Sequence, residues 1–161
     1  MNEFKVPKEL LESAASKMLR IILYIIFGAG IALTVTMPFM IDIYMRILYD
    51  AYELREGYKI FITVFLMVVG TLGLFIILEL IIMLRTMLKN PFVKRNVKSL
   101  NIIGITAFIT AVLFFVKCFL YVTFLTLIFG ICLVIFGLFA FTLANLFNKA
   151  VEYKEENDLT I

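Results

Sequence analysis

The sequence predicts an all-α integral membrane protein, folded as a bundle of four transmembrane helices. Three observations predict this class: 63% of the 161 residues are hydrophobic, only 17% are charged, and the apolar residues come in long blocks. A soluble domain is nearer half apolar and a quarter charged. A soluble fold this short could not hide so much apolar surface from water. Blocks of about 18 or more apolar residues therefore indicate membrane spans.

Four apolar blocks divide the chain, which we take as one membrane domain over residues 1–161. The spans are expected at about 19–41, 60–84, 102–116 and 124–147. A single helix over 102–146 would be about 67 Å long, whereas the hydrocarbon core is only about 30 Å thick. The polar stretch 117–123 is therefore the expected hairpin between the last two spans. Pro38 is expected to kink the outer end of the first span.

Each span carries small residues where a neighbouring helix can approach closely. They are Gly28, Gly30 and Ala32 in the first span, Gly70 and Gly73 in the second, Gly104, Ala107 and Ala111 in the third, and Gly130, Gly137 and Ala144 in the fourth. The pattern predicts helix-packing faces, although it does not distinguish internal packing from contacts with partner helices.

The segments between the spans differ in charge. Residues 42–59 have apolar residues at helical spacing and are expected to lie on the outer surface or to continue the first span. The second connection, 85–101, holds five basic residues and no acidic one, and Asn90-Pro91 within it is a helix stop. The tail, 148–161, is polar and mostly acidic.

The distribution of basic residues predicts the orientation, because Lys and Arg near spans favour the cytoplasmic side. The N-terminal segment, the second connection and the tail together carry eleven Lys and Arg, against four on the other side. Both termini and residues 85–101 are therefore expected in the cytoplasm, and the protein is expected to be multi-pass in a plasma membrane. The charged N-terminal segment shows no cleavage site and is not expected to be a secretory signal.

Catalytic and metal-binding classes are poorly supported. The sequence has no His and no Trp, which removes the usual general base and the commonest metal ligand. Cys118 and Cys132 lie unpaired in apolar sequence. Neither an activated serine nor a phosphate-binding glycine loop is apparent. We expect no enzymatic activity, no cofactor, no metal and no direct nucleic-acid binding.

Glu79 is the one acidic residue well inside a span. A carboxylate in hydrocarbon is costly and usually faces the bundle interior, where it often marks a function. Glu79 is therefore a candidate intramembrane polar site. The alternative is structural: near the cytoplasmic surface, its side chain could meet water or a loop cation such as Lys98 or Arg85.

The basic connection and the acidic tail are expected on the same side of the membrane. Opposite charge would allow the tail to dock on the loop and form one cytoplasmic platform, although exposed ion pairs are individually weak. The alternative is a solvated helix end. The candidate partner-binding residues are Pro91, Phe92, Asn96, Leu100, Glu155, Glu156, Asn157, Asp158, Leu159 and Thr160.

These two segments also carry a family resemblance. Pro91, Phe92, Asn96, Leu100, Ile103 and Gly104 in the loop, and Leu143, Ala144, Phe147 and Glu156–Ile161 in the tail, resemble the bacterial family called domain of unknown function 2975. This sequence has Arg95 where that family often has Glu. The resemblance implies a short four-span membrane protein. The genes of that family often lie beside a gene for a small helix-turn-helix regulator of the Cro and C1 repressor type, so the resemblance implies such a partner.

The leading functional hypothesis is accordingly a non-enzymatic membrane regulator that binds or controls a small cytoplasmic helix-turn-helix protein. An alternative is an immunity or transport protein that binds a toxin, peptide or small solute, in which Glu79 would matter and the tail would be dispensable. A third is a structural subunit of a larger membrane complex. Membrane lipids and further copies of the chain are other partners that the sequence admits.

Overall fold

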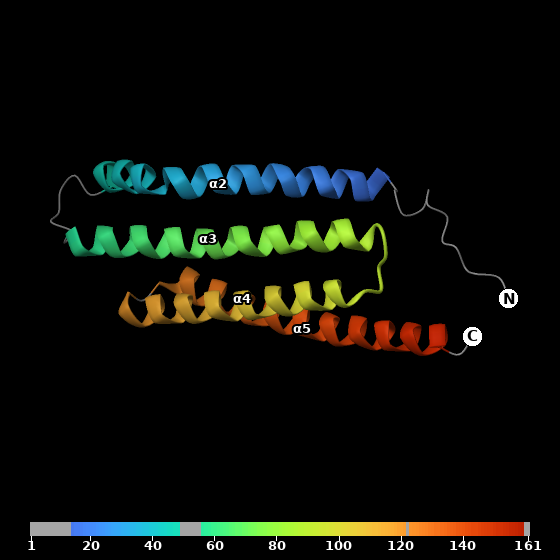
Figure 1. Ribbon diagram of the computed structural model, residues 1–161. Helices are drawn as coiled ribbons and strands as arrows, with labels where there is room; N and C mark the ends of the chain where they lie inside the picture. Colours follow the sequence, from blue (N-terminus) through green and yellow to red (C-terminus); the bar gives the residue numbers. More distant parts are fainter. Residues whose placement is uncertain (1–13, 49–55, 122, 160–161) are drawn as a thin grey trace.

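The computed structural model describes residues 14–48, 56–121 and 123–159, and within them it is all-helical (Figure 1). The helices are α2 (Ala14–Leu48), α3 (Glu56–Met87), α4 (Lys94–Leu120) and α5 (Phe124–Leu159). Each contains a stretch long and apolar enough to cross a membrane. The prediction of four spanning helices is confirmed in that sense, and the architecture suggests a multi-pass membrane protein.

The helices are longer than the predicted spans. α5 has 36 residues, which corresponds to about 54 Å, and it continues from the apolar block through the polar tail. α4 begins at Lys94, well before the apolar block that starts near residue 102. Helical hydrogen bonding satisfies the backbone in lipid and continues into the polar flanks, so the fall in hydropathy does not mark the helix ends.

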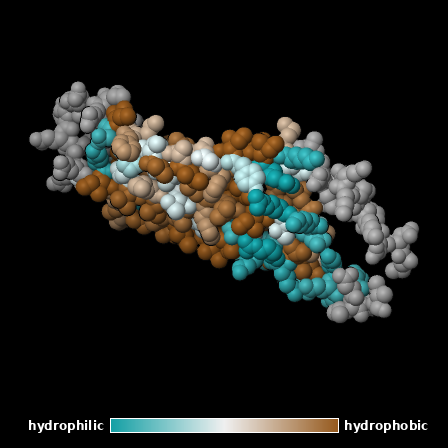
Figure 2. Space-filling model, turned by 45° about the horizontal axis from the view of Figure 1, so that its top comes forward, coloured by the Kyte–Doolittle hydropathy of each residue, from teal (hydrophilic) through white to brown (hydrophobic). Residues whose placement is uncertain are grey.

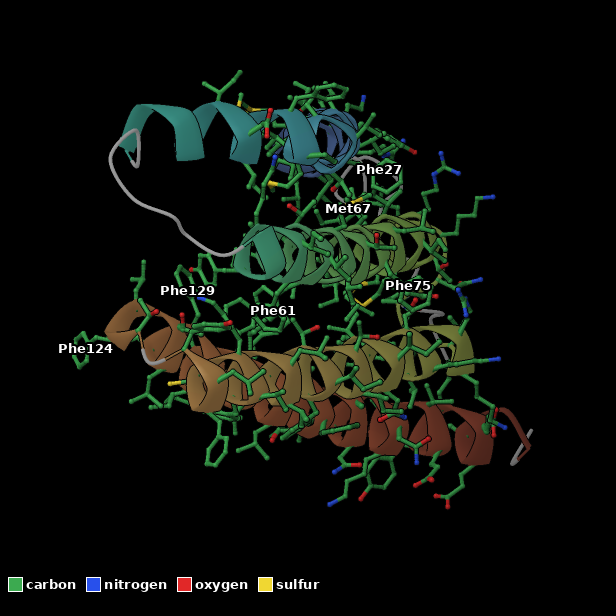
Figure 3. All side chains as sticks on the ribbon, turned by 90° about the vertical axis from the view of Figure 1, so that its left-hand side faces the viewer. Phe27, Phe61, Met67, Phe75, Phe124 and Phe129 are labelled. Atoms are coloured by element: carbon green, nitrogen blue, oxygen red, sulfur yellow. The ribbon has the colours of Figure 1, made fainter. Side chains whose placement is uncertain are left out.

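The helices pack in the order of the chain: α2 against α3, α3 against α4, and α4 against α5 (Figures 1 and 3). The α4–α5 pair makes the most extensive contact and holds most of the buried side chains. Ile103 and Ala107 on α4 and Ala140 and Ala144 on α5 are each at most 3% exposed. The core therefore lies between the last two helices, and α2 forms one edge of the molecule.

Glycines allow the α4–α5 pair to approach closely. A Cβ atom added to Gly137 would lie 2.9 Å from the Phe108 ring and 3.3 Å from the Gly104 carbonyl oxygen. Gly130 meets the Phe115 ring in the same way, at 2.9 Å. These positions are packing faces, as the sequence predicts.

The α2–α3 contact uses only some of its predicted small residues. Gly30 faces Leu74, and Gly70 faces Thr34; in both cases a Cβ would come within 2.8 Å of the partner side chain. Gly28 and Gly73 have nothing within 4 Å. Those two positions do not contribute to internal packing.

The predicted breaks between helices are also present. α3 ends at Met87, so Asn90-Pro91 lies in the connection. α4 continues through Lys117 to Leu120, so the break before α5 is shorter than the predicted hairpin 117–123. α2 continues past Pro38 to Leu48, and Figure 3 shows its outer, teal part running at an angle to the rest of the helix. Of the expected amphipathic segment, residues 49–55 lie outside the described residues.

The outer surface is apolar along most of its length. Figure 2 shows a hydrophobic middle with hydrophilic residues gathered toward the ends. Large apolar side chains such as Ile25, Ile135 and Phe139 are at least 60% exposed. An exposed apolar surface of this extent is typical of a protein that contacts lipid or other proteins.

Candidate functional site

Glu79 on α3 is buried, and residues of α4 bind its carboxylate. Only 6% of Glu79 is exposed. Ser99 Oγ donates a hydrogen bond to Glu79 Oε2 at 2.8 Å. A guanidinium nitrogen of Arg95 lies 3.2 Å from the same oxygen and 3.4 Å from Oε1. These contacts connect the interior of α3 to the first turns of α4.

The spacing along α4 explains this arrangement. Arg95 and Ser99 are four residues apart, so both side chains lie on one face of the helix. The Arg95 side chain remains 37% exposed while its guanidinium group pairs with Glu79, so the ion pair lies at the edge of the buried region. A buried carboxylate is tolerable when it is paired and hydrogen-bonded. The site is therefore a satisfied ion pair and not an isolated charge.

The cation that meets Glu79 is Arg95. The sequence allows water or a loop cation such as Lys98 or Arg85 at this carboxylate, and the structure places another cation of the same loop there. Arg85 instead donates to the Tyr24 hydroxyl on α2, with its guanidinium carbon 5.5 Å from the Tyr24 ring centroid. Lys98 is exposed on another face of α4.

Asn96 fixes the α3–α4 connection next to this pair. Its side chain is completely buried, and Nδ2 donates to the Pro91 carbonyl at 2.7 Å. Its backbone N–H donates to the Val93 carbonyl at 3.0 Å. Val93, at the N-cap of α4, makes no side-chain cap bond. Asn96 therefore supplies the local bonds that hold the turn closed.

Sequence reasoning missed the buried polar row on α4. Ser99, Thr106 and Thr110 are each at most 5% exposed. Each threonine hydroxyl donates a hydrogen bond to the backbone carbonyl one turn earlier, at 2.8 Å. The signal was available, because Asn96, Ser99, Ile103, Thr106 and Thr110 repeat at intervals of three and four residues, which places them on one face.

The α3–α4 connection and the end of α5 meet. Lys94 forms an ion pair with Glu155, with Nζ 2.9 Å from Oε1. The Phe92 and Phe147 rings lie 6.4 Å apart between centroids. We call the surface formed by residues 91–95 and 147–157 the loop–tail face. Figure 2 shows hydrophilic residues gathered at this end of the molecule.

The candidate partner-binding residues divide into exposed and buried members. Phe92, Glu155, Glu156 and Asn157 are exposed, and Pro91 is half-buried. Asn96 and Leu100 are at most 4% exposed, so they support the loop–tail face from beneath. The side chains of Asp158 and Leu159, and the whole of Thr160, lie outside the described residues. Exposed Tyr153 belongs to the face, although the sequence did not single it out.

Within the described residues, no group of three or more His, Cys, Asp or Glu side chains could hold a metal ion. Cys118 and Cys132 are both free thiols. Two groups of polar residues in the described part of the chain are the candidate sites: the buried Glu79 ion pair and the charged loop–tail face.

Four long helices, each apolar enough to cross a membrane, with a charged face at one end, indicate the class: a small all-helical protein of the multi-pass membrane type. Within this class the chain belongs to the family described as "Protein of unknown function (DUF2975)", whose model matches residues 44–161. The match covers the end of α2 and all of α3, α4 and α5, including both segments that carry the resemblance. No curated protein and no solved structure matches the chain.

Proposed function

We propose that the protein is a non-enzymatic membrane regulator whose loop–tail face binds a small cytoplasmic helix-turn-helix protein. The observation that carries this proposal is the joining of loop and tail into one exposed surface by the Lys94–Glu155 ion pair and the Phe92–Phe147 contact. The positive-inside bias supports a cytoplasmic position for this surface, with both termini on the same side of a plasma membrane.

The loop–tail face carries charges of both signs, with Lys94, Arg95, Lys149 and Lys154 beside its glutamates, and the glutamates are the residues that we propose bind a basic partner. Its exposed α5 residues include Glu152, Glu155 and Glu156, and DNA-binding domains carry basic surfaces. Tyr153 and Phe92 add exposed aromatic area, 66% and 46% exposed respectively. Aromatic side chains are frequent anchors of protein interfaces. Binding here would compete with DNA for the basic surface and so restrain the regulator.

The Glu79–Arg95 pair provides a route from the membrane to this face. Arg95 belongs to the loop–tail face and reaches Glu79 inside α3. A change in the α3–α4 packing would therefore move the start of α4. Two packing states with different affinities for the partner would be enough to carry a signal.

Co-purification from membranes tests the proposal. The tagged full chain is expressed with the helix-turn-helix protein encoded beside its gene, and the complex is isolated in a mild detergent. We expect the partner to be retained by the intact chain. It should be lost from Glu155→Lys/Glu156→Lys, because the acidic surface is reversed.

The matched control is Lys149→Glu/Lys154→Glu, which also changes the charge of α5 by four units in total but makes it more acidic. This variant should retain the partner or bind it more tightly. Equal recovery with all three chains, or no recovery with any of them, would contradict the proposal.

An immunity or transport role remains the alternative, and it would depend on Glu79. Glu79→Gln, in a chain that inserts normally, would then abolish resistance or uptake while removal of 148–161 would not. The contacts of Glu79 favour the regulator, since its carboxylate is already occupied by Arg95 and Ser99.

A further inference from the structure

An apolar groove runs between α3 and α4 at the end of the molecule opposite the loop–tail face. It has a volume of about 400 Å³, within the range of small-molecule sites. Its walls are hydrophobic, and they include Ile60, Phe61, Val64 and Phe65 on α3 with Leu113 and Val116 on α4. Figure 3 shows Phe61 in the space between the two helices.

A lysine closes this groove at its polar end. Lys117 lies in the last turn of α4 and lines the groove. Its Nζ donates to Thr126 Oγ1 at 2.8 Å and lies 5.8 Å from the Phe65 ring centroid. The side chain is thus held against the protein and is half-buried. It is not extended into water.

The charge of Lys117 is not neutralised within the described part of the chain. Its contacts there are the neutral Thr126 hydroxyl and the Phe65 ring, and no carboxylate of the described residues forms an ion pair with it. An ammonium group has three donors, of which one is used here. Charged side chains in apolar surroundings are costly and usually pair with an opposite charge. An anionic group at the mouth of the groove would supply that charge.

The aromatic residues at this end of the molecule are of the kind found at the level of lipid headgroups. The Tyr58 and Tyr121 rings lie 4.7 Å apart between centroids, and Tyr121 also contacts Phe61. Tyrosines are enriched at membrane interfaces, where the ring sits in the apolar layer and the hydroxyl reaches water. Lys117, four residues before Tyr121, therefore lies about one turn deeper, just below the headgroup layer, from where a long lysine side chain can reach a phosphate group.

We propose that this groove is a binding site for an anionic phospholipid, with its phosphate on Lys117 and an acyl chain between α3 and α4. A second groove of about 400 Å³ adjoins the first, since Ile60 and Val64 line both. The second groove is lined by Asp42, Lys59 and Thr63 as well as by apolar residues, and its apolar part, next to the first groove, suits the second chain of one diacyl lipid. In the second groove Lys59 is already paired with Asp42, so Lys117 is the residue that selects for negative charge.

Native mass spectrometry of the delipidated full chain tests the site. Dioleoyl phosphatidylglycerol, dioleoyl phosphatidylcholine and glycerol 3-phosphate are titrated separately in a neutral detergent. We expect phosphatidylglycerol to form a saturable one-to-one adduct, and to bind about fivefold more tightly than phosphatidylcholine because of one additional charge contact. Glycerol 3-phosphate, which has no chains to fill the grooves, should not bind.

Three variants identify the residues. Lys117→Gln should remove the preference for phosphatidylglycerol, and Lys117→Arg should keep it. Val64→Trp, which fills the shared wall of both grooves, should weaken both lipids equally. Lys98→Gln, an exposed lysine at the other end of α4, is the control with the same loss of charge and should behave as the native chain.

Circular dichroism melting curves without added lipid verify that each variant is folded. An unchanged preference for phosphatidylglycerol in folded Lys117→Gln would overturn the proposal. Equal binding of the two lipids by the native chain would overturn it as well. Binding of glycerol 3-phosphate as tight as that of the lipid would identify a phosphate site and not a lipid site.

Discussion

At the scale of single residues, the Glu79 carboxylate depends on two donors from another helix. Loss of one partner of a buried pair leaves an uncompensated charge and is more costly than replacement of both. We expect Arg95→Ala to lower the free energy of unfolding by about 2 kcal/mol, less than for a fully buried pair because Arg95 is partly exposed. Ser99→Ala should cost about 1 kcal/mol.

A double-mutant cycle, measured by reversible unfolding in mixed detergent, checks this prediction. In a Glu79→Gln chain, Arg95→Ala should cost less than about 1 kcal/mol, because no buried carboxylate is then left unpaired. The same cost in both backgrounds would show that Arg95 stabilises the protein through something other than Glu79.

Glycine positions provide a second test at this scale. Gly137→Ala would place a Cβ 2.9 Å from the Phe108 ring, so we expect a loss of about 1–2 kcal/mol from overpacking. Gly73→Ala is the matched control, because nothing lies within 4 Å of a Cβ there and alanine is the better helix former. The two unfolding free energies, measured side by side, should change in different directions. Equal losses would contradict the packing described for α4 and α5.

The sequence could predict that Glu79 needs a partner, but not which one. Its cost in hydrocarbon follows from residue type and position alone. Choosing between Arg95 and Lys98 requires the rotation of α4 about its axis, and that rotation follows the buried row containing Asn96 and Ser99. A hydropathy profile does not show this row, because it averages over a window of residues and does not distinguish the faces of a helix.

At the scale of the elements, the main finding is that the tail is helical and joined to the loop. α5 runs without a break from Phe124 to Leu159, and Val151 on its polar part is only 2% exposed. The apolar blocks alone predict where helices cross a membrane. They do not predict where helices end, since polar residues such as Lys and Glu form helices as readily as Leu or Met.

A charge exchange tests the connection between loop and tail. In a chain with Cys118 and Cys132 replaced by serine, a cysteine at Val93 reports the accessibility of the loop. Glu155→Lys should speed maleimide labelling of that cysteine, because the introduced ammonium group repels Lys94. Lys94→Glu in the same chain should restore the slow rate. Since an exposed pair contributes only about 0.5 kcal/mol, we expect a change of about twofold.

The control for this exchange is Glu152→Lys, an identical charge change on the same helix. Glu152 accepts a hydrogen bond from Asn148 within α5 and has no described contact with the loop. Labelling at Val93 should then stay near the native rate. If Glu152→Lys and Glu155→Lys act alike, the general charge of α5 controls the loop, and the Lys94–Glu155 contact does not.

At the scale of the whole molecule, the four helices differ in how many of their side chains are buried against neighbouring helices. Most of the buried side chains belong to the α4–α5 pair, whereas the spanning part of α2 has no buried residue in its most apolar window. The number of helices follows from the apolar blocks and the thickness of a bilayer. Their packing order does not, because small residues occur on all four, and only the structure distinguishes Gly137, which is in close contact, from Gly28, which is not.

The difference in buried contacts between the α2–α3 pair and the α4–α5 pair predicts the order in which the helices separate on unfolding. Fluorophore pairs are placed at the outer ends of α2 and α3 in one chain and at those of α4 and α5 in another. As denaturing detergent is raised, the α2–α3 pair should separate before the α4–α5 pair, because fewer buried contacts hold it. Simultaneous separation would indicate a single cooperative unit. The reverse order would contradict the location of the core.

The central claim is that the loop–tail face lies in the cytoplasm of a four-span protein, and cysteine accessibility in whole cells tests it most directly. Single cysteines are introduced at Asn157 on α5 and at Thr123 in the α4–α5 turn, in a chain with Cys118 and Cys132 replaced by serine. A membrane-impermeant maleimide should label position 123 in intact cells and position 157 only after the cells are opened. Labelling of position 157 in intact cells would place the face outside and contradict the account.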